Sequence, residues 1–174
     1  HLDASILKNP DLAEERIREV QAAYRSLVLE VRQHHPDVQL ARGFEVMLDV
    51  PGPDLSDPRV RLAGTRFVLV EWPRLQIPPG TTTVLRRIRG DGWRPVIAHP
   101  ERYHGLDPQL AILREWTRAG AFLQVNHGSL NGRYGNEARN RAFRILEGGI
   151  AHYLSTDYHG RPGPGLHRRD DQPG

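Results

Sequence analysis

The stretch PVIAHPERYHGLDPQLAILREWTRAGAFLQVN, residues 95–126, decides the fold class because it predicts a strand, a helix and a second strand in succession. The apolar segment Pro95–His99 predicts the first strand. An Asp-Pro pair opens the predicted helix Asp107–Ala119, and a glycine closes it. The segment Ala121–Asn126 is again apolar and predicts the next strand. Two strands joined through a helix form a βαβ unit, which indicates a parallel sheet.

The same order of strand, turn and helix continues on both sides of this stretch. Further strands are predicted over Val38–Val46, Arg66–Glu71 and Ile150–Thr156, and further helices over Thr81–Arg89 and Asn136–Glu147. Short strands that alternate with helices of this length are typical of parallel α/β folds. The sequence therefore predicts an α/β protein built around one parallel sheet.

A long amphipathic helix precedes these elements. Asn9 and Pro10 are typical of a helix start, and the segment His34-His35-Pro36 ends the pattern. Apolar residues recur with the period of a helix, so one stripe is expected to face a core. That stripe consists of Ile17, Val20, Tyr24, Leu27, Val28 and Val31.

Composition excludes several classes of protein. The chain has 174 residues, close to one domain, and its longest apolar run, Phe67–Val70, is far shorter than the ~20 residues of a membrane span. There is no cysteine, which excludes a disulfide framework, a thiolate zinc site and a cysteine nucleophile. The first residues, His1–Asp11, are polar and charged and do not match a signal peptide, so a cytoplasmic protein is predicted.

Positive charge is carried almost entirely by arginine. Lys8 is the one lysine among 24 cationic residues, and the net charge is only +3. A small charge spread along the whole chain does not indicate a nucleic-acid-binding surface. The bias towards arginine has two explanations, the base composition of the genome or the recognition of phosphate by planar guanidinium groups.

Metal-ligating or polar side chains are expected at the ends of the predicted strands. In parallel α/β folds the carboxyl ends of the strands form one rim, where chemistry takes place. Carboxylates and imidazoles on one rim suit Mn, Fe, Zn or Mg, and two metals ~3.5–4 Å apart can activate water for phosphoester hydrolysis. Each residue alone also fits an ordinary surface role, but five strand ends agree. They are Glu45, Glu71, His99, Asn126 with His127, and Asp157 with His159.

Three motifs resemble the CpsB/CapC-type protein-tyrosine phosphatases, bacterial members of the polymerase and histidinol phosphatase (PHP) superfamily. They are Val96–Tyr103, Leu123–Asn126 and Ser155–Arg161, and the segments Gly43–Val46 and Leu62–Trp72 match as well. The resemblance extends over about residues 1–161. It predicts one phosphatase domain over residues 1–160, followed by a disordered Gly/Pro/Arg/Asp-rich tail over residues 161–174.

The resemblance implies a distorted (β/α)7 barrel with a di- or trinuclear metal cluster, usually of manganese, with Fe, Zn or Mg as alternatives. The implied activity is hydrolysis of phosphotyrosine on the tail of a bacterial tyrosine kinase that controls capsule or exopolysaccharide export. Arg102 and Arg161 match the arginines that bind phosphate in this family. The implied metal ligands are His1, Glu45, Glu71, His99, Asp157 and His159.

The chain departs from the family pattern at both ends. The family has a strand with the motif Asp-x-His-x-His upstream of the position of His1, and a final helix after the position of His159. We therefore expect an incomplete barrel that lacks the first βα unit and the C-terminal helix. Loss of two imidazoles is expected to weaken or remove one metal site.

Two other functions remain open from the sequence. One is a PHP phosphoesterase that acts on a small phosphomonoester such as histidinol phosphate, and the other is an inactive remnant that at most binds a partner. The absence of cysteine agrees with direct attack by metal-activated water. The sequence leaves the metal, the kinase and the oligomeric state open, including a homo-oligomer.

Overall fold

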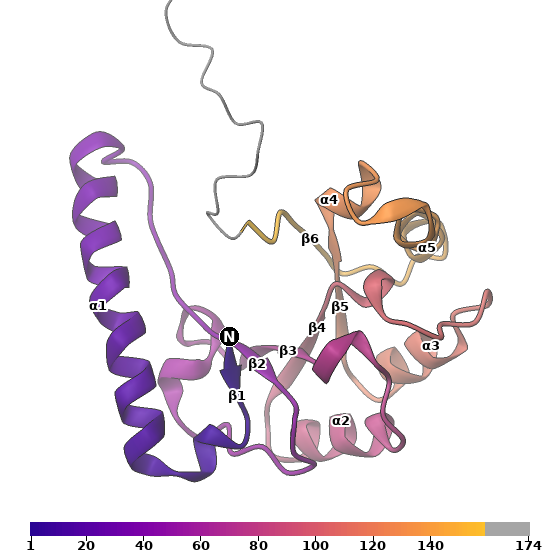
Figure 1. The fold of residues 1–174 in the computed structure, drawn as a ribbon, viewed down its shortest axis with the longest axis horizontal. Coiled ribbons are helices and arrows are strands. Elements are labelled where there is room, and N and C mark those ends of the chain that lie inside the picture. Colours follow the sequence, from indigo (N-terminus) through magenta and orange to yellow (C-terminus); the bar gives the residue numbers. More distant parts are fainter. Residues whose placement is uncertain (159–174) are drawn as a thin grey trace, which may run out of the picture.

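A computed structural model describes residues 1–158, which form a six-stranded sheet in the order β1-β2-β3-β4-β5-β6 (Figure 1). Each strand pairs in parallel with the next one along the chain. The predicted α/β fold with a parallel sheet is therefore confirmed. The strands are β1 Leu2–Asp3, β2 Glu45–Met47, β3 Phe67–Glu71, β4 Arg94–Ala98, β5 Phe122–Asn126 and β6 Tyr153–Ser155.

Helices connect the strands and cover one face of the sheet. This face is lined by valine, isoleucine and leucine side chains that are completely buried, such as Val68, Ile97 and Leu123. The helices add buried residues of their own to the same cluster, including Ile17 and Trp116. The helices are α1 Pro10–His34, α2 Thr81–Gly90, α3 Ala111–Arg118, α4 His127–Leu130 and α5 Gly135–Glu147, with short 3₁₀ turns such as η5 Pro100–Arg102.

The opposite face of the sheet carries the polar site at one end and aromatic side chains at the other. On β3, Phe67 and Glu71 share this face because alternate residues of a strand point the same way. Glu45 pairs with Leu69, which places it on the same face. The Phe67 and Phe122 rings meet edge to face with their centroids 5.2 Å apart. One face therefore supplies the core, and the other supplies the site.

The first helix begins where the sequence predicts but buries less than expected. The Asn9 side chain accepts hydrogen bonds from the Asp11 and Leu12 N–H groups, which confirms the cap. Of the predicted apolar stripe, Ile17 is buried whereas Leu27 is 51% exposed. A 25-residue helix is about 37 Å long, while strands of three to five residues extend only about 10–17 Å. The second half of α1 therefore projects past the sheet, as Figure 1 shows.

The prediction of a strand over Val38–Val46 is wrong for most of its length, because the strand β2 starts at Glu45. The segment before it bonds to a neighbouring loop and not to a strand. The Phe44 N–H donates to the Val60 carbonyl, and the Ala63 N–H donates to the Arg42 carbonyl. These contacts satisfy the backbone locally and leave only a short parallel strand.

Two other boundaries differ from the predictions. The helix α3 starts at Ala111 and not at Asp107, because Leu110 has a φ of +56°, which no α-helix accommodates. The Asp107 carboxylate instead accepts bonds from the Gln109 and Ala111 N–H groups. The last strand is reduced to Tyr153–Ser155. The short elements β1 and α4 carry too few residues to show a period, so the sequence pattern did not predict them.

Two sequence-based expectations, the closed barrel and the disordered tail, stay predictions. The described strands form an open row from β1 to β6, so closure into a distorted barrel stays a prediction. The predicted disordered tail, residues 161–174, lies outside the described residues. No helix within residues 1–158 combines the length and the apolar character that crossing a membrane requires.

A buried hydrogen bond between α2 and α3 offers a test of the packing. The Trp116 indole N–H donates to Thr81 Oγ1 at 2.9 Å, and both side chains are buried. In Thr81→Val the indole N–H loses its acceptor, so the free energy of unfolding should fall by about 1–3 kcal/mol in urea titrations. Thr83→Val, on the exposed side of the same helix, should change it by less than about 0.5 kcal/mol. Equal losses in both variants would contradict the assigned role.

Candidate metal centre

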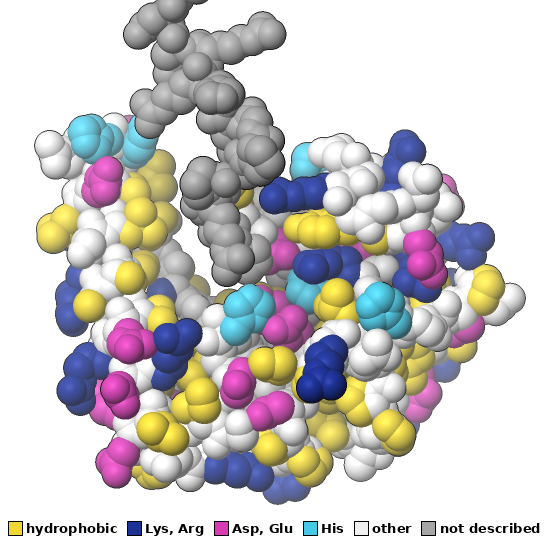
Figure 2. Space-filling view, viewed as in Figure 1, with side chains coloured by type: hydrophobic (Ala, Val, Ile, Leu, Met, Phe, Trp, Pro, Cys, Tyr) yellow, Lys and Arg dark blue, Asp and Glu magenta, His cyan; other side chains and the backbone are white. Residues whose placement is uncertain are grey.

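Two carboxylates and two imidazoles meet on the polar face of the sheet. Glu71 Oε1 lies 2.8 Å from His1 Nδ1, and Glu45 Oε2 lies 3.5 Å from His1 Nε2. On the other side, His99 Nε2 lies 3.3 Å from Glu45 Oε1 and 3.6 Å from Glu71 Oε2. Each imidazole thus contacts both carboxylates. Figure 2 shows histidine, acidic and arginine side chains gathered at the middle of this face.

Strand register brings the four groups together. Glu71 is the last residue of β3, whereas Glu45 is the first residue of β2, so the prediction that Glu45 ends its strand is wrong. Met47 is the residue that pairs with Glu71. The two glutamates are therefore offset by two residues along the sheet and still point to the same face. The two carboxylates meet across this offset through the His1 and His99 rings, which each contact both of them.

His99 is held by an unusual backbone conformation. It follows β4 directly with φ of +34° and ψ of +56°, in the left-handed region that few non-glycine residues adopt. The next residue is Pro100, which further restricts the backbone before it. His99 is only 3% exposed. Strained residues of this kind are concentrated at functional sites, where the surrounding structure holds them in place.

Three of these side chains could hold one divalent cation. One ligand atom from each of His1, Glu45 and Glu71 lies within 4.8 Å of the others. Glu45 Oε1 is buried and accepts no hydrogen bond among residues 1–158, and its ion-pair neighbour there is His99 Nε2 at 3.3 Å. Carboxylate and imidazole ligands suit Mn, Fe, Zn and Mg in different proportions. The donor set is therefore consistent with a metal site, and its occupant stays a prediction.

The electrostatics of the cluster favour the uptake of a cation. Burial and the neighbouring Glu45 carboxylate raise the pKa of Glu71, while His99 and Arg102 act against this shift. A carboxylate whose ionised form is penalised in this way gains from a nearby positive charge. A bound divalent cation would reverse the local balance because it is the largest charge in such a site.

Asp157 and Arg102 lie side by side next to this cluster. Arg102 donates through one terminal nitrogen to Asp157 Oδ2 at 3.3 Å, and Asn126 Nδ2 donates to the same oxygen at 2.8 Å. Asp157 also has a left-handed backbone, with φ of +47°. Two other predicted site residues, His159 and Arg161, lie outside the described residues. The structure thus brings His1, Glu45, Glu71 and His99 together, and Arg102, which pairs with Asp157, acts on Glu71 through its charge.

Sequence reasoning missed a buried acid beneath the site. Glu101 is completely buried, and it accepts hydrogen bonds from the Asn126 N–H at 3.0 Å and the Ser129 hydroxyl at 2.6 Å. Burial raises the pKa of Glu101. These bonds fasten the turn after His99 to the end of β5. Glu101 lies within the motif Val96–Tyr103, but spacing alone does not distinguish a ligand from a support, so its role was not predicted.

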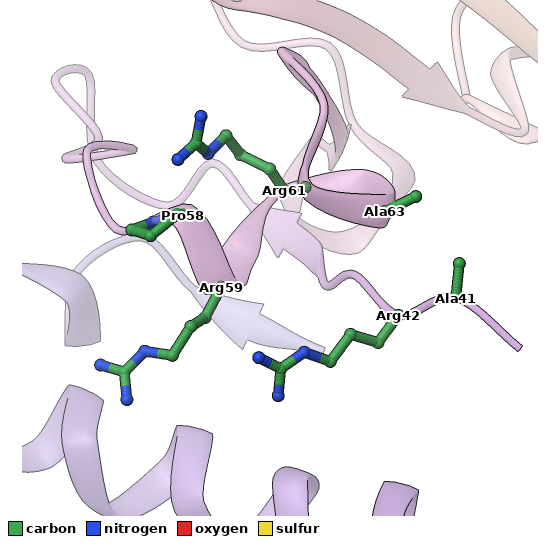
Figure 3. Close-up of a pocket in the computed structure, with 7 residues that line it drawn as sticks. Ala41, Arg42, Pro58, Arg59, Arg61 and Ala63 are labelled. Carbon is green, nitrogen blue, oxygen red and sulfur yellow. The ribbon is translucent and has the colours of Figure 1, made fainter. Parts of the chain in front are cut away.

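A cavity of about 340 Å³ outside the cluster is lined by Arg42, Arg59 and Arg61 (Figure 3). Figure 3 shows Arg42 and Arg59 pointing the same way, towards a helix, while Arg61 points elsewhere. Two carboxylates neutralise Arg59, Glu14 at 2.8 Å and Asp57 at 2.7 Å. The Arg61 guanidinium lies over the Trp93 ring. Arg59 thus links α1 to the segment before β3. Because carboxylates neutralise Arg59 and Arg61 packs on a ring, the arginines of this cavity do not converge on one anion.

Comparison with known proteins gives concordant matches. The family model described as "Capsular polysaccharide synthesis, CpsB/CapC" matches residues 7–166. A putative tyrosine-protein phosphatase CapC of Staphylococcus aureus is 33% identical over 95 residues, which cover 55% of this chain and 37% of that protein. The tyrosine-protein phosphatase YwqE of Bacillus subtilis (strain 168) is 30% identical over 98 residues, covering 56% and 39%. The matched regions thus span about two fifths of these curated relatives.

A solved structure also matches. It belongs to work on YwqE from Bacillus subtilis and CpsB from Streptococcus pneumoniae, described as unique metal-dependent tyrosine phosphatases. The TM-score is 0.69 at 25% sequence identity, and the match covers 78% of this chain and 56% of the other. The likeness therefore extends from sequence motifs to the arrangement of the sheet.

Removing one carboxylate tests the cluster. In the metal-free protein, Glu71→Gln should raise the melting temperature by about 2–4 °C, because it relieves the repulsion of two largely buried carboxylates. In the wild type, Mn²⁺ at about 100 times its Kd should raise the melting temperature by about 5–10 °C, and this rise should be lost in Glu71→Gln. Scanning calorimetry with and without chelator measures both effects, and Glu115→Gln on the exposed side of α3 is the control.

The pH dependence has a definite sign. Because the pKa of Glu71 is raised on folding, its ionisation costs stability above the ordinary value of 4.5. The stabilisation in metal-free Glu71→Gln should therefore be largest near neutral pH and vanish as the pH falls below 4.5. A gain that persists at low pH would show that repulsion is not its cause.

Proposed function

The chain belongs to the CpsB/CapC family of capsular polysaccharide synthesis proteins, and from this premise we propose that it is a metal-dependent phosphatase that hydrolyses phosphotyrosine. The relatives that it matches are named tyrosine-protein phosphatases, and the structurally similar proteins are described as metal-dependent. The observation that carries the proposal is the cluster of His1, Glu45, Glu71 and His99 with Arg102 beside it.

In this proposal, one group of residues holds the metal and another binds the phosphate. A divalent cation held by the carboxylates and imidazoles would supply an activated water and neutralise charge on the phosphoryl group. Asp157 and His159 are proposed to complete the ligand set. Arg102, with Arg161 as its proposed second partner, binds the phosphate oxygens through guanidinium N–H groups. These groups face the charge that grows on the phosphoryl oxygens as water attacks.

Water is the proposed nucleophile. The 174 residues contain no cysteine, so no thiolate is available for the covalent route that cysteine-dependent phosphatases use. Arg102 is positioned to bind phosphate and not to transfer a proton, because a guanidinium stays protonated in proteins. Direct displacement at phosphorus is therefore the mechanism that these side chains support.

The finer parts of the proposal follow from the family. We propose manganese as the preferred metal, and the phosphotyrosine tail of a bacterial tyrosine kinase of capsule or exopolysaccharide synthesis as the substrate, dephosphorylated in the cytoplasm. The parallel order of six strands supports a distorted (β/α)7 barrel as the fuller fold. The matched family and the cation-binding cluster support these assignments jointly.

Phosphate release from two substrates tests the activity. Metal-loaded protein should hydrolyse a phosphotyrosine peptide with a kcat/KM well above that for histidinol phosphate, and EDTA should abolish the reaction. A preference for the small phosphomonoester would favour a metabolite phosphatase. Fewer than one bound metal per chain together with no phosphate release would identify an inactive chain that at most binds a partner.

Arg102 gives the sharpest mutational test. Arg102→Ala should lower kcat/KM on a phosphotyrosine peptide by about 10²-fold or more, since contacts to a developing charge have effects of this size. Metal content, measured by atomic spectroscopy, should not change because arginine is not a ligand. Arg86→Ala, an exposed arginine of α2, is the control and should leave kcat/KM within about twofold. A similar loss from both substitutions would rule out a phosphate contact by Arg102.

A further inference from the structure

An aromatic ring lies against the guanidinium of Arg102. The guanidinium carbon lies 4.3 Å from the centre of the Tyr134 ring, well within the range of a cation–π contact. The same guanidinium donates to Asp157. Arg102 is therefore restrained by a ring and by a carboxylate.

A glycine-rich turn holds the Tyr134 ring in place. Tyr134 lies between α4 and α5, in a segment where Gly132 and Gly135 both have positive φ, +77° and +91°. A Cβ placed on Gly128 would lie 3.0 Å from Tyr134 Cε2, so a side chain at that position would push the ring away. Three glycines in eight residues thus allow the ring to pack closely against α4 and reach Arg102.

Arg102 needs such a restraint to act on phosphate. An arginine side chain loses rotamer entropy when it is fixed, and its five N–H donors bind phosphate only in a defined orientation. One terminal nitrogen is used by Asp157. A ring stacked on the planar face orients the guanidinium without using any donor, so the remaining N–H groups stay available to an anion.

We propose that Tyr134 is a positioning residue, which orients Arg102 towards the phosphoryl group of the substrate. This inference rests on the proposed function for its substrate, while the stacked geometry stands independently. The ring, and not the hydroxyl, carries the effect, because the contact is with the ring centre and no hydrogen bond of the Tyr134 hydroxyl accompanies it among residues 1–158. Tyr134→Phe should thus retain the function that Tyr134→Leu loses.

A double-mutant cycle tests the proposal. Tyr134→Leu should lower kcat/KM on a phosphotyrosine peptide by about three- to tenfold, in line with a partly exposed cation–π contact, while Tyr134→Phe stays within about twofold. In an Arg102→Ala background, Tyr134→Leu should have no further effect. Tyr24→Leu is the matched control, since Arg42 lies over the Tyr24 ring at 5.9 Å outside the metal centre. Equal losses in both backgrounds, or equal losses from Phe and Leu, would overturn the proposal.

A second readout does not depend on turnover. The Arg102 Nε–H resonance, assigned by its loss in Arg102→Ala, should carry a ring-current shift that disappears in Tyr134→Leu and persists in Tyr134→Phe. Titration of the Mg²⁺-loaded protein with inorganic phosphate should show about threefold or more weaker binding in Tyr134→Leu. If no variant hydrolyses phosphotyrosine, the proposed function fails and this titration alone decides the role of Tyr134. Unchanged phosphate affinity in Tyr134→Leu would overturn the positioning role of Tyr134.

Discussion

The repulsion between Glu45 and Glu71 is the constraint on which the site depends. Two carboxylates on adjacent parallel strands point to the same face and are largely withdrawn from water. Such a pair is unfavourable on its own, because burial and like charge both oppose ionisation. The protein surrounds it with cationic or polarisable groups, two imidazoles and the guanidinium of Arg102. The folded chain therefore offers a site at which a bound positive charge would be stabilised.

The site and the hydrophobic core lie on opposite faces of the same sheet, so the buried carboxylates do not disturb the core. Val68 and Val70 alternate with Leu69 and Glu71 along β3, so this strand supplies residues to both the core and the site. The segment after β4 then ties the strands together, since the Tyr103 hydroxyl accepts a hydrogen bond from the Trp72 N–H next to Glu71. Glu101 makes the equivalent connection to β5. The supports of the site are therefore buried hydrogen bonds between neighbouring strand ends.

The sequence predicted the parts of this structure that depend on local chemistry. The cap at Asn9 and the order of strands and helices follow from residue type and period. What the sequence did not predict depends on partners far along the chain. The start of β2 is set by hydrogen bonds to residues 60–63, and the roles of Glu101 and Tyr134 are set by contacts with β5, α4 and Arg102. No periodic pattern carries that information.

The left-handed backbone at His99 limits how this site can change over evolutionary time. Asparagine and aspartate tolerate such a conformation, whereas β-branched residues are strongly disfavoured there, and the following proline narrows the choice further. Random substitution at position 99 is thus filtered by backbone geometry before any selection on activity. Glycine passes this filter most easily but carries no side-chain ligand atom, whereas asparagine and aspartate keep an oxygen or nitrogen that can contact a cation. Among residues with a side chain, the backbone at position 99 therefore favours those that keep a potential metal ligand.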